Sequence, residues 1–70
     1  MGSEEDTYNT IFHALKHPIR RRILRQLESN PATFTALLDE LGIDNGLLNY
    51  HLNNLNELIT KGPNEKYRLS

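Results

Sequence analysis

The sequence predicts a mainly α-helical domain with a small β-hairpin, in the element order α-α-β-α-α-β-β. Three observations lead to this fold class. Apolar residues recur at helical spacing from residue 8 to residue 55, interrupted at prolines and glycines. Two short amphipathic segments meet at Gly42, a residue that suits the end of a helix. Residues 58–70 read as two strands around a turn that begins at Gly62 and Pro63.

The first two predicted helices are separated by a proline. Residues 1–6 are polar and are predicted to form a disordered tail, so that the folded domain covers residues 7–70. The first helix should end at His17, because the residue before a proline disfavours the α conformation. Pro18 can open the second helix, where its missing N–H costs nothing. The apolar stripe of that helix is Ile19, Ile23, Leu24 and Leu27.

The next segment contains a second pair of helices. Residues 32–34 are long enough only for a bridging strand, and Thr35 is predicted to cap a helix over 36–41. Asp44 is predicted to cap the longer helix that follows, residues 44–57. Two short helices joined by a tight turn form the helix-turn-helix pattern, whose second helix can lie in a DNA major groove.

The remaining residues form the predicted hairpin, with strands over 58–61 and 66–70. Side chains alternate between the two faces of a strand. We therefore expect Tyr67 and Leu69 to point inward, and Lys66 and Arg68 to point outward.

Length and composition indicate one small domain. A chain of 70 residues buries only roughly 60% of the surface that its unfolded form exposes, so its core is modest. The absence of cysteine excludes disulfides, thiolate metal sites and a cysteine nucleophile. No apolar run is long enough to span a bilayer, and residues 1–15 lack the pattern of a signal peptide. We expect a soluble, cytoplasmic domain without membrane contact.

Six short motifs, in order and at matching spacing, resemble winged helix-turn-helix repressors of the ArsR type. The run Ala14-Leu-Lys-His-Pro-Ile-Arg-Arg-Arg-Ile-Leu-Arg-Gln-Leu27 resembles the opening of these proteins. Gly42-Ile43, Tyr50-His51-Leu52, Leu55 and Lys66-Tyr67-Arg68-Leu69 resemble the rest, and the compact archaeal ArsR-like regulators are the most similar. The resemblance covers residues 8–70.

This resemblance implies a DNA-binding domain of a transcription regulator. Double-stranded DNA would be the partner, with the recognition helix 44–57 in the major groove and the wing 58–70 on the backbone. The family usually binds operators as a homodimer, but its dimer contacts include a helix after the wing that this sequence does not contain. Any homodimer of this piece is therefore expected to be weak or absent. The family's thiolate metal sites need cysteines, so no metal or cofactor is expected.

By position in the family, a set of residues should face DNA. On the recognition helix these are Asn45, Gly46, Leu47, Asn49, Tyr50 and Asn53, and beside the wing tip Lys61 and Lys66. Asparagine can bind adenine through two hydrogen bonds, and a leucine can touch a thymine methyl group. The alternative is that the asparagines form only a solvated polar face.

Charge is distributed unevenly along a chain whose net charge is −1. Residues 16–25 carry +5 and residues 61–70 carry +2, whereas residues 43–60 contain no lysine or arginine. If the two basic regions meet in space, they form a basic face despite the acidic total. Arg21 and Arg25 share a helix face and are candidates for phosphate contact, with a solvated face as the alternative.

Other polar residues have structural interpretations. Arg20 is expected to form an ion pair with Glu28, Asp39 or Glu40, and His51 is expected to be a hydrogen-bonded structural residue near the apolar seam. His13 and His17 have a spacing that could hold a metal, but no third ligand is evident and Pro18 interrupts the helix. No nucleophile, base and orienting group occur together in a recognisable pattern, so the sequence does not indicate an enzyme.

Two other functions remain open. The uncharged Leu/Asn/Tyr face of helix 44–57 could pack on a protein, which would make the domain a winged-helix protein-interaction module without direct DNA contact. Leu47 is the best support for that alternative. RNA binding is a third hypothesis for the function of the domain.

Overall fold

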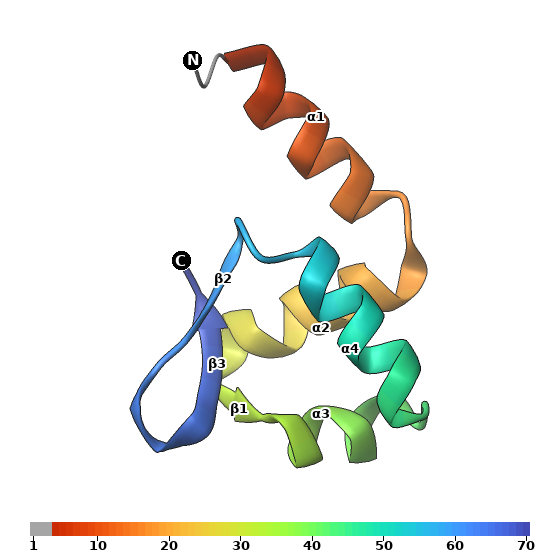
Figure 1. Cartoon of the computed structure of the whole chain (residues 1–70), viewed down its shortest axis with the longest axis vertical. Coiled ribbons are helices and arrows are strands. Elements are labelled where there is room, and N and C mark those ends of the chain that lie inside the picture. Colours follow the sequence, from red (N-terminus) through yellow and green to blue (C-terminus); the bar gives the residue numbers. More distant parts are fainter. Residues whose placement is uncertain (1–3) are drawn as a thin grey trace.

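The computed structural model describes residues 4–70, and from residue 5 onward it also describes side chains. The helices are α1 (Glu4–Leu15), α2 (Pro18–Ser29), α3 (Phe34–Leu41) and α4 (Asn45–Asn54). The strands are β1 (Ala32–Thr33), β2 (Ile59–Lys61) and β3 (Lys66–Leu69), with a 3-10 turn η1 (Pro63–Glu65) between the last two. The order confirms the predicted winged helix-turn-helix (Figure 1).

Helix α1 begins inside the segment predicted to be a disordered tail. Residues 1–3 lie outside the described residues, whereas Glu4–Asp6 form the first turn of α1. Acidic residues near a helix N-terminus interact favourably with the helix dipole. This local preference, which the prediction did not count, accounts for the earlier start.

Proline, threonine and glycine set the start of α2 and both ends of α3. His17 has extended backbone angles and Pro18 occupies the first turn of α2, as predicted. The predicted cap of α3 was wrong, because Thr33 rather than Thr35 fills this position and its hydroxyl accepts from the backbone N–H of Ala36 at 3.1 Å. Gly42 ends α3 with a φ of 65°, the left-handed conformation that glycine adopts without cost.

Helix α4 starts where it was predicted to start and ends three residues early. The Asp44 carboxylate accepts from the N–H of Leu47 at 2.7 Å and caps the helix. The last helical residue is Asn54, and Leu55 lies outside with a φ of −103° and a ψ of 9°. A turn then leads into β2, with the N–H groups of Leu58 and Ile59 bonded to the Leu55 carbonyl.

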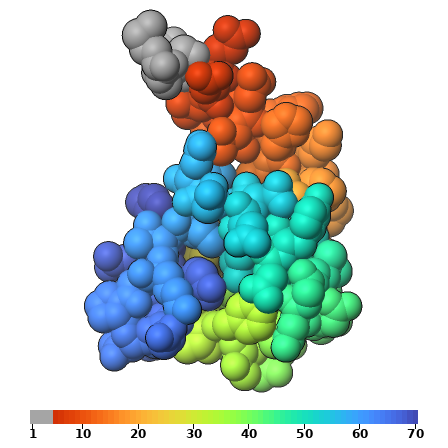
Figure 2. Space-filling model, viewed as in Figure 1, coloured from red at the N-terminus to blue at the C-terminus, as the bar shows by residue number. Residues whose placement is uncertain are grey.

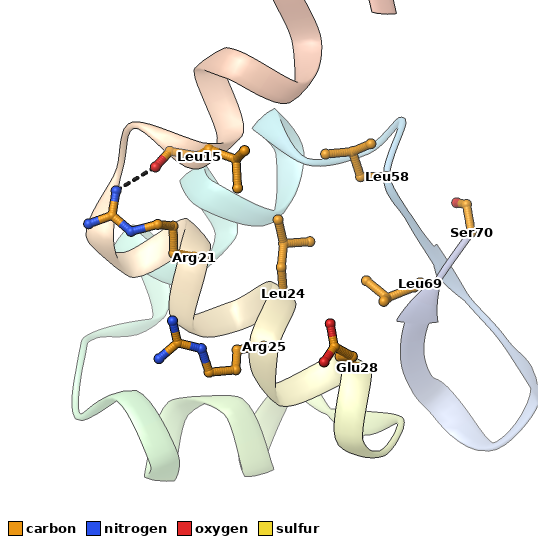
Figure 3. Close-up of a pocket in the computed structure, with 8 residues that line it drawn as sticks. All are labelled: Leu15, Arg21, Leu24, Arg25, Glu28, Leu58, Leu69 and Ser70. Atoms are coloured by element: carbon orange, nitrogen blue, oxygen red, sulfur yellow. Dashed lines mark hydrogen bonds between the residues drawn. The ribbon is translucent and has the colours of Figure 1, made fainter. Parts of the chain in front are cut away.

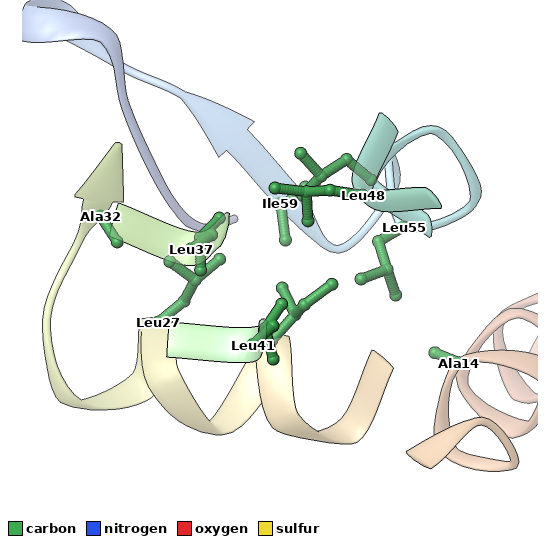
Figure 4. Packing of buried hydrophobic residues seen from close by; sticks show 10 residues of the cluster. Ala14, Leu27, Ala32, Leu37, Leu41, Leu48, Leu55 and Ile59 are labelled. Atoms are coloured by element: carbon green, nitrogen blue, oxygen red, sulfur yellow. The ribbon is translucent and has the colours of Figure 1, made fainter. Parts of the chain in front are cut away.

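The core lies between α2, α3, α4 and the sheet (Figure 4). Its four fully buried large side chains are Ile23, Leu37, Leu48 and Leu55. Helix α1 contributes Ala14 to the same cluster. The buried apolar side chains of α2, α3 and α4 are therefore removed from water by packing against one another and against the sheet.

The sheet has three antiparallel strands in the order β1-β3-β2. Ala32 pairs with Tyr67, and on the other edge Ile59 pairs with Leu69. Tyr67 is half-buried as predicted, but Leu69 is 39% exposed and the prediction that it points into the core was wrong. Leu69 lies near the end of the chain, where it lines an open groove beside α2 rather than the core.

Helix α1 projects from the body of the molecule (Figures 1 and 2). Several of its apolar side chains are exposed. Tyr8 is 73% exposed and Phe12 is 62% exposed, with Ile11 and Leu15 exposed to a lesser degree. Among residues 4–70, none of the helices has the length and apolar character needed to cross a bilayer.

Candidate nucleic-acid interface

The outer face of α4 carries the residues that the sequence singled out. Asn45, Leu47, Asn49, Tyr50 and Asn53 are all exposed. The opposite side of the helix, with Leu48, His51 and Leu52, is buried. The helix therefore presents amide groups and a tyrosine to solvent while its leucines hold it in the core.

A shallow hollow lies between α4 and the hairpin. Its volume is about 200 Å³, and it is lined by Asn49, Leu52, Asn53, Asn56, Ile59, Lys61 and Tyr67. Three predicted contact residues, Asn49, Asn53 and Lys61, thus meet around one feature of the surface. The hollow joins the amide face of α4 to strands β2 and β3 of the wing.

A family model described as a helix-turn-helix domain matches residues 15–59, from the end of α1 to the start of β2. The chain belongs to this helix-turn-helix family. No curated protein and no solved structure matches the chain. In helix-turn-helix proteins the second helix of the motif, here α4, is the one that reaches base edges.

Lys61, the last residue of β2 before the wing tip, already has a partner within the domain. Lys61 Nζ lies 2.7 Å from the Glu65 carboxylate and 5.6 Å from the centre of the Tyr67 ring. The hydrogen bond and charge of Glu65 raise the pKa of Lys61, and the same contact lowers the pKa of Glu65. An exposed ion pair of this kind contributes little to stability, so a phosphate group can compete for the lysine.

The wing tip has a backbone conformation that was not predicted from its sequence. Asn64 and Glu65 both have positive φ values, 65° and 60°, and the N–H of Gly62 closes the loop on the Lys66 carbonyl at 2.8 Å. A Cβ added to Gly62 would lie 3.6 Å from Nε of Arg68. Arg68 therefore lies beside the tip together with the predicted lysine Lys66, which is exposed.

Arg21 and Arg25 lie on another side of this helix-turn-helix domain. The side of α2 that faces the core carries Arg20, Ile23 and Leu27. Successive helix residues point about 100° apart, which turns Arg25 almost directly away from that side. Both arginines line a groove of about 450 Å³ with Leu15, Leu24, Glu28, Leu58, Leu69 and Ser70 (Figure 3). The structure does not bring them to the face formed by α4 and Lys61.

The groove also changes the interpretation of Arg21. Its guanidinium donates a hydrogen bond to the backbone carbonyl of Leu15, at the end of α1. The contact satisfies a carbonyl that the helix end leaves without an intrahelical partner. Arg21 therefore helps hold the junction between α1 and α2. The neighbouring Arg22 donates to the carbonyl of Glu40 near the end of α3, at 3.2 Å.

The predicted ion pair of Arg20 was wrong. Arg20 is buried, and its Nε donates to Nδ1 of His51 at 3.0 Å. Its Nη1 donates to the carbonyl of His13 at 3.4 Å, and its guanidinium lies 5.7 Å from the centre of the Tyr50 ring. The prediction of a structural, hydrogen-bonded His51 is confirmed. Its partner was missed because the two residues are 31 positions apart and neither motif indicates the other.

No metal centre is visible in the part of the chain that the structure describes. Within residues 4–70 no three His, Cys, Asp or Glu residues are grouped so that they could hold a metal ion. The His17 ring instead lies 5.6 Å from the His51 ring, and His13 contacts Phe12.

Proposed function

We propose that this chain is the DNA-binding domain of a transcription regulator of the ArsR type, akin to its compact archaeal members. Helix α4 enters the major groove of double-stranded DNA and the wing lies on the backbone. The observation that carries the proposal is the outer face of α4, which is uncharged, rich in amides and continuous with a cationic wing. On this proposal the domain acts in the cytoplasm, which holds the DNA of such a cell. It binds DNA and does not catalyse a reaction.

The exposed residues divide by chemistry into two roles. Asn45, Asn49 and Asn53 can pair with base edges, and Leu47 can contact a thymine methyl group. Tyr50, Lys61 and Lys66 are donors suited to phosphate oxygens, which position a protein without reading sequence. With no lysine or arginine on α4, affinity depends heavily on the wing. Arg21 and Arg25 are left out of this footprint because they line the groove behind α2.

The exposed face of α1 supports pairing of two copies. Tyr8, Ile11, Phe12 and Leu15 follow helical spacing and are exposed. If each of these four side chains buries on the order of 100 Å² in a dimer, the two copies together bury on the order of 800 Å². That total lies below the area of most specific, stable interfaces, so the homodimer is weak and depends on concentration.

Charge favours an antiparallel arrangement of the two α1 helices. When Tyr8 of one copy faces Leu15 of the other, the acidic turn Glu4–Asp6 approaches the partner's junction between α1 and α2. Lys16 lies in that junction, and Arg21 lies in the first turn of α2 beside it. Both contacts occur twice in a two-fold dimer, because each copy provides both surfaces.

A salt-dependent titration with mixed-sequence duplex DNA tests the proposal. Each lost phosphate contact should reduce the slope of log affinity against log salt by about 0.9, so Lys61→Ala and Lys66→Ala should each show that change. Arg25→Ala removes the same charge from the side of α2 that faces away from the core. It serves as the control and should leave the salt slope unchanged. If duplex DNA does not bind at low salt, DNA binding is excluded. The protein-interaction module then remains, to be tested with Leu47→Asp.

Selection from a random duplex pool tests the reading role of α4. Asn49→Ala should relax the preference at one base pair, by about 1–3 kcal/mol if it forms a bidentate pair with adenine. An equal loss of affinity across all sequences would instead make Asn49 a backbone contact.

A further inference from the structure

A buried cation joins α2 to α4 through neutral groups. Arg20 is 5% exposed, and its contacts are the imidazole of His51, the carbonyl of His13 and the ring of Tyr50. Among the described side chains, residues 5–70, no carboxylate lies at ion-pair distance from this guanidinium. A buried charge is costly unless hydrogen bonds compensate it. The position of Arg20 therefore depends on these acceptors, and chiefly on the shortest contact, at His51.

The contact between Arg20 and His51 fixes the protonation state of the imidazole. Arginine has only donors, so the Nδ1 atom of His51 must offer a lone pair. His51 is then neutral, with its proton on Nε2. A second proton on Nδ1 would point at the N–H of Arg20 and place two cations side by side in a buried space.

Among the side chains that the structure describes, none that faces His51 would compensate such a charge. Arg20 approaches from α2, His17 from the junction before α2 with its ring at 5.6 Å, and Tyr50 from α4 itself at 5.3 Å. Burial lowers the pKa of His51 most, followed by the positive charge of Arg20 and then the proximity of His17. The site therefore tolerates the neutral imidazole and opposes the charged one.

The pair lies directly beneath the proposed DNA-binding face. Tyr50 is 56% exposed on the outer side of α4, while the guanidinium of Arg20 lies against its ring. His51 is the next residue on the same helix. Loss of the contact between Arg20 and His51 would free both the helix and the tyrosine from their anchor on α2.

We infer that Arg20 is a positioning residue for the recognition helix α4, acting through neutral His51, and that protonation of His51 releases this anchor and weakens DNA binding in acid. The inference rests on the proposed DNA-binding function. It deepens that function by adding a regulating variable, the protonation of one buried side chain.

The sign of the pH effect separates this inference from simple charge attraction. Protonation of histidines adds positive charge, which by itself tightens binding to a polyanion. Release of α4 acts in the opposite direction, because only molecules with a correctly placed helix bind well. A loss of affinity on acidification therefore requires a positioning effect.

Fluorescence anisotropy with a labelled mixed-sequence duplex provides the test, at fixed low salt between about pH 7.5 and about pH 5.5. The unmodified chain should lose up to about tenfold in affinity, the limit set by protonation of a histidine with an ordinary pKa near 6.5. His51→Gln keeps an acceptor for Arg20 and does not titrate, so its affinity should hold or rise. His17→Gln is the matched control and should still show the loss. Identical pH profiles for the unmodified chain and His51→Gln would overturn the inference.

A second measurement does not depend on DNA. Long-range ¹H–¹⁵N spectra of the histidine rings should show Nδ1 of His51 unprotonated at neutral pH, and the Tyr50 ring signals should shift with the same midpoint as His51. Arg20→Lys keeps the charge but removes the Nε donor, and should shift the Tyr50 signals already at neutral pH. A proton on Nδ1 at neutral pH would overturn the inference. If the spectra agree but no duplex binds, the proposed function fails while the Arg20–His51 anchor stands.

Discussion

Helices α1 and α4 each expose one face, but the two faces are opposite in character. Helix α1 exposes Tyr8 and Phe12 and buries mainly a small alanine, Ala14. Helix α4 buries Leu48 and Leu52 and exposes amides. Apolar residues at helical spacing thus indicate a buried stripe without saying what buries it. In α4 the rest of the same chain covers the stripe, whereas in α1 a large part of it stays open.

The attachments of the two helices differ accordingly. Helix α4 is held by core leucines, the Asp44 cap and the Arg20–His51 contact. Helix α1 is attached through Ala14, a hydrogen bond from Thr10 to Glu57 at 3.1 Å, and donors from α2 to its last carbonyls. A face anchored in this way suits recognition of a rigid polyanion, and an open apolar arm suits a second protein surface.

The largest effect is expected from the buried side of α4. Leu48→Ala should reduce the free energy of unfolding by about 2–5 kcal/mol, because it leaves a cavity in the core. Leu47→Ala, one residue away and 37% exposed, is the matched control and should cost less than about 1 kcal/mol. Urea unfolding followed by circular dichroism measures both. Equal losses would show that α4 is not oriented as described.

On α1, a charge in the apolar face should act on assembly rather than on folding. Phe12→Asp should weaken self-association by more than tenfold, since it places a carboxylate where apolar surface would be buried in both copies. Asn9→Asp adds the same charge at an exposed position of the same helix. Sedimentation equilibrium compares the two variants with the unmodified chain. A monomer at all concentrations, before any substitution, would instead argue that another partner covers α1.

Acid should destabilise the domain through its two perturbed histidines. Burial is the main cause that lowers the pKa of His51 and of His17, with nearby positive charges adding to it. Below about pH 6.5, the ordinary histidine value, the unfolded chain therefore binds more protons than the folded one. The free energy of unfolding should have its full value above that pH. It should decline as the pH falls through the lowered pKa values of the two histidines. Thermal unfolding of His51→Gln should show a weaker decline, and a steeper one would contradict this assignment.

The cap of α4 offers a smaller effect. Asp44→Ala should cost about 1 kcal/mol, because the N–H of Leu47 loses its side-chain acceptor. Asp39→Ala removes the same charge from an exposed position within α3 and should be close to neutral. If Asp39→Ala costs as much as Asp44→Ala, the effect is one of net charge and not of capping.

The smallest effect is expected at Gly46, in the first turn of α4. A Cβ there would meet only Asp44 Oδ1, at an ordinary distance of 3.5 Å, so Gly46→Ala should stabilise the domain by about 0.5–1 kcal/mol. Gly42→Ala should destabilise it by about 1–2 kcal/mol, because Gly42 has a φ of +65°. Differential scanning calorimetry distinguishes the opposite signs.

Local chemistry made much of the architecture predictable. Pro18 opens a helix because its ring fixes φ, Gly42 ends one because it lacks a Cβ, and Asp44 caps one because its carboxylate reaches a free N–H. Each of these causes acts over a few residues, so the sequence alone displays it. The exposed amide face of α4 followed from the same periodicity.

The neighbouring sequence does not decide whether Thr33 or Thr35 caps α3. Both are good N-cap residues, and their positions in the sequence do not rank them. In the structure Thr33 pairs with Lys66 of β3, which holds its backbone extended just before the helix begins. A strand more than thirty residues away therefore decides where α3 starts.

By itself the sequence determined the order of the elements, the start of α2 at Pro18, the end of α3 at Gly42 and the Asp44 cap of α4. It also determined which side of α4 faces outward, because backbone sterics and helical periodicity are properties of neighbouring residues. Tertiary structure alone decided that Arg20 meets His51, that Arg21 and Arg25 lie away from the wing lysines, and that the apolar side of α1 stays open. These outcomes depend on how separate helices pack, and packing joins residues whose positions in the chain carry no information about each other.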